Sequence, residues 1–172
     1  GLGNIGKRVA KLCKSFDMRV IGTKKHVENV DNVDLVFPPQ DLKKYLPEAD
    51  YFVIAAPLTP STENMVGNEE FEIMKESSYL INVGRGKIVY EPALIEALKN
   101  EKIGGAYLDC NVEEPLPPNH PLWNIDTAFI IPHDSHSSPF IGDRIVVRFC
   151  ENLRRYVDGN SLLHICDPLK GY

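Results

Sequence analysis

Apolar and polar residues follow two different periods along the chain. From Ile5 to Phe16 the apolar side chains recur every three or four positions, which predicts an amphipathic helix over 4–16. Residues 51–56 instead form an uninterrupted apolar run, which is typical of a parallel strand covered on both faces of its sheet. The same patterns predict further strands over 18–22, 34–37, 79–83, 104–109 and 127–131, and further helices over 41–46, 69–75, 92–100 and 141–157.

Strands that alternate with helices in this way indicate an α/β fold with a doubly wound parallel sheet. The segment 115–121 reads PLPPNHP, and its prolines exclude both a central strand and a helix interior there. It is therefore expected to be a loop between two strands. The last predicted helix, 141–157, is followed by Gly159, a typical C-terminal stop.

Charge and composition narrow the range of partners. The 172 residues carry 19 Lys and Arg against 24 Asp and Glu, a net charge of −5. This acidic balance argues against nucleic-acid binding, and no apolar run approaches the roughly 18 residues of a membrane helix. Four cysteines without a CxxC pair predict free thiols and a cytoplasmic location. Residues 1–25 carry a local excess of seven Lys and Arg over one Asp, which forms either a solvated helix face or a site for a small anion.

Three glycines open the first predicted helix with the spacing GxGxxG, at Gly1, Gly3 and Gly6. In this arrangement the backbone approaches the pyrophosphate of a dinucleotide, and the helix N-terminus stabilises its negative charge. A helix and a short strand follow, as in a Rossmann-like domain. In the order 3-2-1-4-5-6, the strand before the glycines lies inside the sheet, so we expect this sequence to lack the first strand of its fold.

The strand predicted over 18–22 should end beside the adenosine ribose. Sites that prefer NAD(H) usually place Asp or Glu there, whereas this chain continues with Thr23, Lys24 and Lys25. A hydroxyl and two ammonium groups suit a 2′-phosphate better than a diol. We therefore expect NADP(H) to be preferred over NAD(H). The alternative is that both lysines are solvated loop residues.

The sequence resembles the D-isomer-specific 2-hydroxyacid dehydrogenase family over nearly its whole length. The resemblance rests on an ordered set of segments: GLGNIG (1–6), APLTPST (56–62), INVGRG (81–86), ALIEAL (93–98), LDCNVEEPLP (108–117), HPLW (120–123) and Pro132-His133. The family includes glyoxylate, hydroxypyruvate, phosphoglycerate and formate dehydrogenases, and corepressors of the C-terminal-binding-protein type. The resemblance implies hydride transfer between NAD(P)H and a small 2-oxo acid or D-2-hydroxy acid, in a homodimer.

Three residues match the catalytic positions of the family. Arg85 would hold the substrate carboxylate and carbonyl through its planar fork of donors. His133 would protonate the carbonyl oxygen as hydride arrives and remove that proton in the reverse direction. Glu114 would accept the proton on the other ring nitrogen and raise the basicity of the histidine. Glu113 is the rival carboxylate, but Glu114 directly precedes the proline, as the family pattern requires.

Further positions match the family's cofactor contacts. The resemblance places Asn4 and Ile5 at the pyrophosphate turn and Asp109 at the nicotinamide carboxamide. It also places Ala56 and Pro57 in the wall near the adenosine and nicotinamide ribose, and Val83 and Gly84 in the loop under the nicotinamide. Arg85 and His133 would adjoin the nicotinamide. We expect His136, Ser137 and Ser138 to line the substrate mouth.

Other interpretations remain open. The run His133-Asp134-Ser135-His136 could suggest a metal, but no third ligand follows at a characteristic spacing, so we expect none. The corepressor branch makes a dinucleotide-sensing binding module the main alternative to an enzyme, and an inactive fragment is a further one.

We expect a dinucleotide-binding domain over 1–140, and a C-terminal helix and tail over 141–172 that return to an N-terminal substrate domain missing here. The 172-residue chain alone should be inactive.

Overall fold

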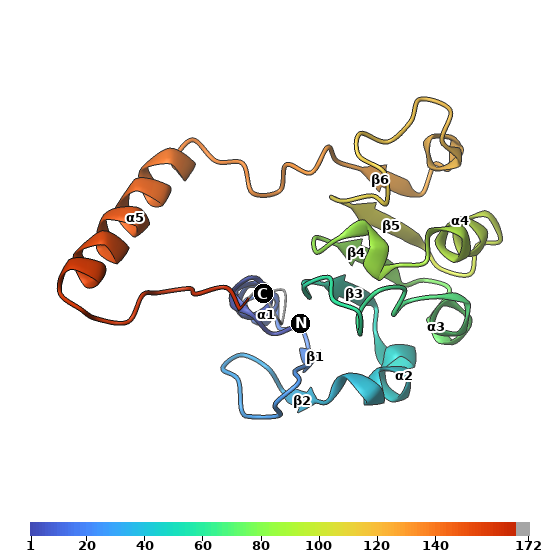
Figure 1. The fold of residues 1–172 in the computed structure, drawn as a ribbon. Helices are drawn as coiled ribbons and strands as arrows, with labels where there is room; N and C mark the ends of the chain where they lie inside the picture. The colour runs from blue at the N-terminus through green and yellow to red at the C-terminus, as the bar shows by residue number, and fades with distance from the viewer. Residues whose placement is uncertain (168–172) are drawn as a thin grey trace. The chain divides into compact units, whose positions relative to one another are not determined.

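A computed structural model describes residues 1–167, and the last five residues of the predicted tail lie outside this range. The chain divides into two compact units, the first Gly1–Pro132 and the second beginning at His133. The domain boundary expected at 140 and 141 stays a prediction. The first unit contains, in chain order, α1 (Asn4–Lys14), β1 (Ile21–Thr23), β2 (Leu35–Phe37), α2 (Leu42–Tyr45), β3 (Tyr51–Ile54), α3 (Asn68–Ile73), β4 (Tyr79–Asn82), α4 (Glu91–Lys99), β5 (Gly105–Leu108) and β6 (Ala128–Ile130) (Figure 1).

All the strands of the first unit pair in parallel, as the sequence predicts. Strands β3 to β6 form one sheet in the order β3-β4-β5-β6, and β1 pairs with β2 in a separate two-stranded sheet. Gly1 and Leu2 lie between the two sheets, because the Leu2 amide donates to the Thr23 carbonyl (3.3 Å) and a Cβ at Gly1 would lie 2.8 Å from the backbone nitrogen of Ala56. The glycine-rich turn therefore sits at the carboxyl ends of β1 and β3.

Strand β1 begins later than the sequence pattern predicts. The Met18 amide donates to the carbonyl of Cys13 at the end of α1 (3.2 Å), and the Val20 amide donates to the Asp34 carboxylate (2.7 Å). These amides are thus used outside the sheet, and the strand starts only at Ile21. The Val20 hydrogen bond, with a second one from Lys14, holds the pKa of Asp34 below its usual range.

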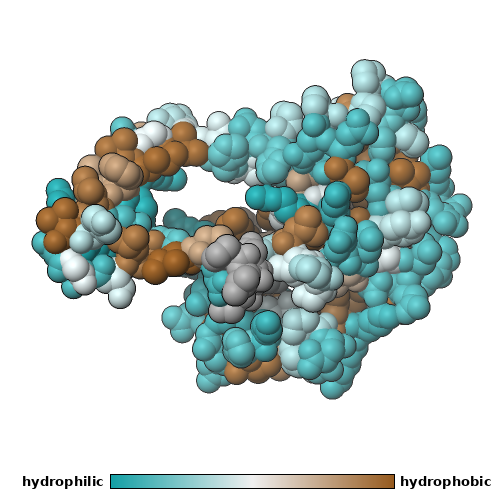
Figure 2. Space-filling view, in the orientation of Figure 1, coloured by the Kyte–Doolittle hydropathy of each residue, from teal (hydrophilic) through white to brown (hydrophobic). Residues whose placement is uncertain are grey.

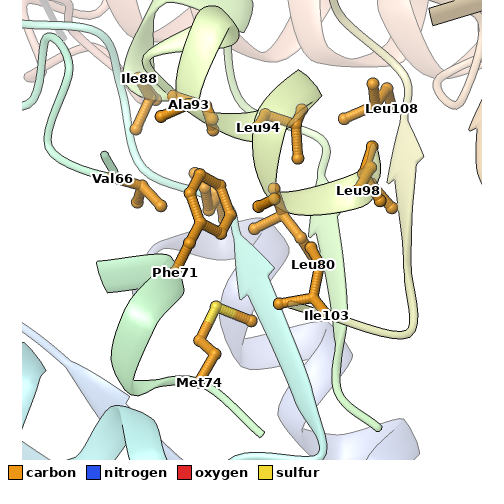
Figure 3. Packing of buried hydrophobic residues seen from close by; sticks show 14 of the residues in the cluster. Val66, Phe71, Met74, Leu80, Ile88, Ala93, Leu94, Leu98, Ile103 and Leu108 are labelled. Carbon is orange, nitrogen blue, oxygen red and sulfur yellow. The ribbon is translucent and has the colours of Figure 1, made fainter. Parts of the chain in front are cut away.

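The apolar core lies between one face of the four-stranded sheet and the helices α3 and α4. Figure 3 shows Phe71 and the adjoining Met74 from the α3 region meeting Leu94 and Leu98 from α4 over Leu80 of β4. These side chains are at most 6 % exposed. Burying each one contributes about 1.5–3 kcal/mol, so this face of the sheet is the stable base on which the loops at its carboxyl edge are built.

The other face of the sheet carries aromatic rings. Because side chains alternate along a strand, Tyr51, Tyr79, Tyr107 and Phe129 all point away from the buried face. Tyr51 stacks on Tyr79 with ring centroids 6.3 Å apart, and Tyr107 stacks on Phe129 at 5.2 Å. Tyr51 is 57 % exposed within the structure. The expectation that the strand at 51–56 is covered on both faces is therefore wrong for the first unit, where α3 and α4 cover one face.

Helix α1 packs through its small residues rather than through its apolar stripe. Gly6 and Ala10 are buried, whereas Ile5, Leu12 and Phe16 are more than half exposed. Small side chains let the helix approach the ends of β1 and β3 closely. The amphipathic pattern correctly predicts the helix but not the face that is buried.

The second unit is built around helix α5 (Ile141–Val157), which has the bounds predicted from its periodicity. The helix ends as expected, because Gly159 adopts a φ of +69°. Asn152 ties the following segment to the helix through two hydrogen bonds with the backbone of Leu163 (2.8 and 3.2 Å). Several apolar side chains of α5 are exposed, among them Phe149 at 65 %, and Figure 2 shows hydrophobic surface along this helix. None of the helices within residues 1–167 is both long and apolar enough to cross a membrane.

Candidate active site and cofactor site

The glycine-rich turn has the shape that a pyrophosphate requires. A Cβ at Gly6 would lie 1.9 Å from the carbonyl oxygen of Gly1, so the turn closes only if this position lacks a side chain. A Cβ at Gly3 would have no neighbour within 4 Å among the described residues, which leaves this stretch of backbone open on the outer side of the turn. The first turn of α1 begins at Asn4, and basic side chains follow it at Lys7 and Arg8. These features suit a phosphate group at the helix N-terminus.

The residues predicted to surround the cofactor's ribose groups lie on either side of this turn. The backbone nitrogen of Gly1 donates to the Thr23 hydroxyl (3.4 Å) at the end of β1, and Gly1 also packs against Ala56 beyond β3. Pro57 comes next, and its carbonyl accepts a hydrogen bond from the Thr62 hydroxyl (2.7 Å). Segments at least 22 positions apart in sequence are thus brought to the same edge of the fold.

A buried asparagine shapes the loop that carries Arg85. Asn82 ends β4 and is 1 % exposed. Its amide nitrogen donates to the Arg85 carbonyl (3.0 Å), and its amide oxygen accepts from the Gly84 amide (3.0 Å). The Arg85 guanidinium is exposed and donates to the Gly84 carbonyl (2.7 Å). The arginine therefore stands on a fixed turn, with its guanidinium exposed.

Glycines also pack this loop against its two neighbours. A Cβ at Gly84 would lie 2.8 Å from the carbonyl oxygen of Ala56, and one at Gly86 would lie 2.1 Å from that of Asn111. The loops that follow β3, β4 and β5 consequently touch backbone to backbone. Val83 and Gly84 lie in the middle loop, next to the Ala56 loop, and their place under the nicotinamide stays a prediction.

The loop after β5 holds Glu114 in a defined position. The Asp109 amide donates to the Asn82 carbonyl (3.0 Å), and the Asn111 amide donates to Glu114 Oε1 (2.9 Å). The side-chain oxygen of Asn111 is buried and has no hydrogen-bond partner within residues 1–167. The choice of Glu114 over Glu113 as the catalytic carboxylate stays a prediction.

The thiol of Cys110 lies in the same loop. Its side chain is 2 % exposed, and its sulfur lies 3.7 Å from the Asn82 carbonyl oxygen. Burial, together with the nearby carboxylates of Glu114 and Asp109, raises the pKa of Cys110 to about 12. Cys110 is therefore a neutral packing residue at physiological pH.

Lys24 and Lys25 differ in their surroundings. Lys24 follows β1, and its ammonium pairs with the carboxylate of Glu28 on the same loop. Its side chain is 26 % exposed. Lys25 is exposed. The carboxylate of Glu28 was not singled out from the sequence, and it changes the charge at the position where a 2′-phosphate is expected.

His133 is the first residue of the second unit and follows β6 through Ile131 and Pro132. Its φ is +53°, a conformation that is uncommon for residues with a side chain. Such backbone conformations cluster at functional sites. Ser138 accepts a hydrogen bond from the Phe140 amide (3.2 Å) just before α5. The roles assigned to His133, His136, Ser137 and Ser138 stay predictions.

A side-chain contact also connects the proline-rich loop with α4. His120 Nε2 lies 3.1 Å from Glu91 Oε1 at the start of α4, and His120 Nδ1 accepts from the Leu122 amide (3.3 Å). The indole of Trp123 donates to the Pro117 carbonyl (2.8 Å). Across the described range, 1–167, no cluster of three or more His, Cys, Asp and Glu side chains is arranged to hold a metal ion.

A GxGxxG turn at the carboxyl edge of a parallel α/β sheet defines a dinucleotide-binding domain. Residues 1–135 match the family described as D-isomer specific 2-hydroxyacid dehydrogenase, NAD binding domain, and the chain belongs to this family. It is 36 % identical over 159 residues to a glyoxylate reductase from Aeropyrum pernix, covering 92 % of this chain and 48 % of the relative. The chain spans about half the length of the curated relatives it matches.

Solved structures agree with this assignment. A D-isomer specific 2-hydroxyacid dehydrogenase from Xanthobacter autotrophicus Py2, crystallised with NADPH and MES, superposes with a TM-score of 0.91 at 32 % identity, covering 100 % of this chain and 70 % of that one. An NADPH-dependent glyoxylate/hydroxypyruvate reductase from Sinorhizobium meliloti, in complex with NADP and sulfate, gives a TM-score of 0.91 at 26 % identity, covering 100 % of this chain and 55 % of that one.

Proposed function

We propose that the protein carrying this chain is an NAD(P)-dependent oxidoreductase that interconverts a small 2-oxo acid, such as glyoxylate or hydroxypyruvate, and the corresponding D-2-hydroxy acid. The observation that carries the proposal is the backbone contact between the loops of Arg85 and Glu114, at the edge of the sheet that also holds the glycine turn. The family assignment and the names of the relatives support the same reaction.

Each of the three proposed catalytic residues has a distinct task. Arg85 binds the substrate carboxylate and polarises the carbonyl, His133 donates the proton to the carbonyl oxygen, and Glu114 stabilises the charged imidazole. The bound nicotinamide supplies the hydride. The hydrogen bonds of Asn82 already fix the backbone at Arg85, so binding an anion there needs no further ordering of the main chain.

The proposed cofactor is NADP(H) in preference to NAD(H). Thr23 lies at the end of β1 beside the glycine turn, and Lys24 follows it directly. Relatives crystallised with NADPH or NADP support this choice. The remaining cofactor contacts proposed from the sequence are Asn4, Ile5, Ala56, Pro57, Val83, Gly84 and Asp109.

The test is the reduction of glyoxylate, hydroxypyruvate and pyruvate by the full-length protein, followed by the absorbance of the reduced nicotinamide. His133→Ala should lower kcat by about 10² to 10⁴, the usual contribution of a general acid. His164→Ala, which changes an exposed histidine of the same unit, serves as the matched control and should leave kcat unchanged. A His133→Ala enzyme within a few-fold of wild type would remove this residue from the mechanism.

Dinucleotide binding can be tested separately from turnover. Gly3→Ala adds a methyl group that meets no atom of residues 1–167 within 4 Å, so the variant should fold normally. The methyl group would stand where the pyrophosphate approaches, so we expect the Kd for NADPH to rise at least tenfold. An unchanged Kd in a folded Gly3→Ala protein would refute the assigned pyrophosphate site.

The assembly and location of the protein are part of the same proposal. We propose a homodimer in the cytoplasm, consistent with the four free thiols at Cys13, Cys110, Cys150 and Cys166. Light scattering on the full-length protein, with and without NADPH, tests the dimer. A dimer that forms only with dinucleotide, in a protein without turnover, would favour the sensor alternative over the enzyme.

A further inference from the structure

The loop that follows β1 carries a carboxylate among its cations. The Lys24 amide donates to the Phe37 carbonyl at the end of β2 (3.0 Å), so the backbone of Lys24 is fixed between the two strands. Its ammonium is paired with Glu28, four residues further along. The positive charge of Lys24 is thus already balanced within the loop.

Groups beyond Lys24 also act on Glu28. The hydrogen bond from Lys24 is the main cause that lowers the pKa of Glu28, and Lys7 of α1 and His26 add to the effect. Glu28 is therefore a carboxylate at neutral pH. A cavity of about 400 Å³ lies beside the first turns of α1, between Lys7, Arg8 and Lys11 and the loop residues 29–32. Lys7 thus lines this cavity and also helps to lower the pKa of Glu28.

We propose that Glu28 is a specificity-determining residue that weakens the preference for NADP(H) over NAD(H), because its carboxylate competes with the 2′-phosphate for Lys24. The inference rests on the proposed dinucleotide site. A 2′-phosphate approaching Lys24 must either displace Glu28 or lie beside a second negative charge. A ribose diol carries no charge and needs no such displacement.

The competition makes opposite predictions for the two charged residues. Glu28→Gln keeps nearly the same shape but removes the negative charge, so NADPH should bind at least three-fold more tightly while the Kd for NADH stays within two-fold of wild type. Lys24→Gln should weaken NADPH binding and leave NADH nearly unchanged. Since exposed charges are screened by salt, the gain in Glu28→Gln should shrink as the ionic strength rises.

The experiment measures the Kd values of NADPH and NADH for the full-length protein by nicotinamide fluorescence, at low and high salt. The variants are Glu28→Gln, Lys24→Gln and the double variant, in which the effect of Glu28→Gln should be smaller than in the presence of Lys24. Glu69→Gln is the matched control, since it removes a carboxylate from another exposed lysine pair, with Lys43.

Each outcome decides a different point. A rise in the ratio of NADPH to NADH affinity in Glu28→Gln, absent in Glu69→Gln, supports the inference. A ratio in Glu28→Gln equal to that of wild type overturns it and leaves the proposed cofactor site intact. Wild-type protein that binds neither dinucleotide overturns the proposed cofactor site, and the role of Glu28 with it.

Discussion

Replacing Asn82 by alanine should destabilise the protein more than any neighbouring polar substitution. The change removes the hydrogen bonds to the Arg85 carbonyl and from the Gly84 amide, both 3.0 Å long. Each contributes about 1 kcal/mol net, and the Gly84 amide left without a partner adds about 1–3 kcal/mol. We therefore expect the free energy of unfolding to fall by about 3–5 kcal/mol, which is a large part of the roughly 5–15 kcal/mol that stabilises a typical domain.

Urea unfolding followed by circular dichroism measures this loss. The slope of the unfolding free energy with urea should be unchanged, because the wild-type protein and the Asn82→Ala variant expose a similar surface on unfolding. Asn119→Ala, an exposed position on the proline-rich loop, is the control and should shift the free energy by less than about 0.5 kcal/mol. A loss below about 1 kcal/mol for Asn82→Ala would show that the Arg85 turn does not depend on this side chain.

Three further perturbations test other parts of the structure. Gly86→Ala places a methyl group 2.1 Å from the Asn111 carbonyl, so the loop after β5 must move, and we expect at least a tenfold loss of kcat/KM in the steady-state assay. Cys110, with a pKa of about 12 and 2 % exposure, should resist iodoacetamide at pH 8.5 while the exposed Cys166 reacts, as read by mass spectrometry; equal labelling would contradict its burial. Folding lowers the pKa of Asp34, so the contribution of its carboxylate to stability is present above about pH 4 and is lost as the pH falls further. Asp34→Asn should therefore make the free energy of unfolding less dependent on acid pH, as measured by urea unfolding at several pH values.

Much of the fold follows from periodicity alone, and the exceptions have local causes. Helix α5 has its predicted bounds because its apolar spacing continues without a break up to Gly159. The strand predicted at 18–22 is displaced because the Asp34 side chain takes the Val20 amide, a contact between residues 14 positions apart that no periodic pattern encodes. The exposed face of β3 was missed because Tyr51 is apolar enough to fit a buried strand.

The candidate site was predictable where it depends on topology. Parallel strands bring their carboxyl ends to one edge, so the adjacency of the Arg85 and Glu114 loops follows from the order of the strands. The role of Asn82 was missed, although a polar residue at the end of an apolar strand is a usable signal. Glu28 could not be found from the sequence, because its pairing with Lys24 depends on the conformation of a loop without regular structure.

The glycine contacts at positions 84 and 86 also bear on how such a site can diversify. Where two loops meet through main-chain atoms, the spacing between them does not depend on the side chains that project from either one. Neighbouring positions such as Lys87, Val112 and Glu113, all exposed, can then be exchanged without disturbing the frame. In the enzyme proposed above, this separation would let substitutions beside the loops alter the choice of acid while the proposed catalytic residues keep their places, which makes these three positions natural targets for redesigning selectivity.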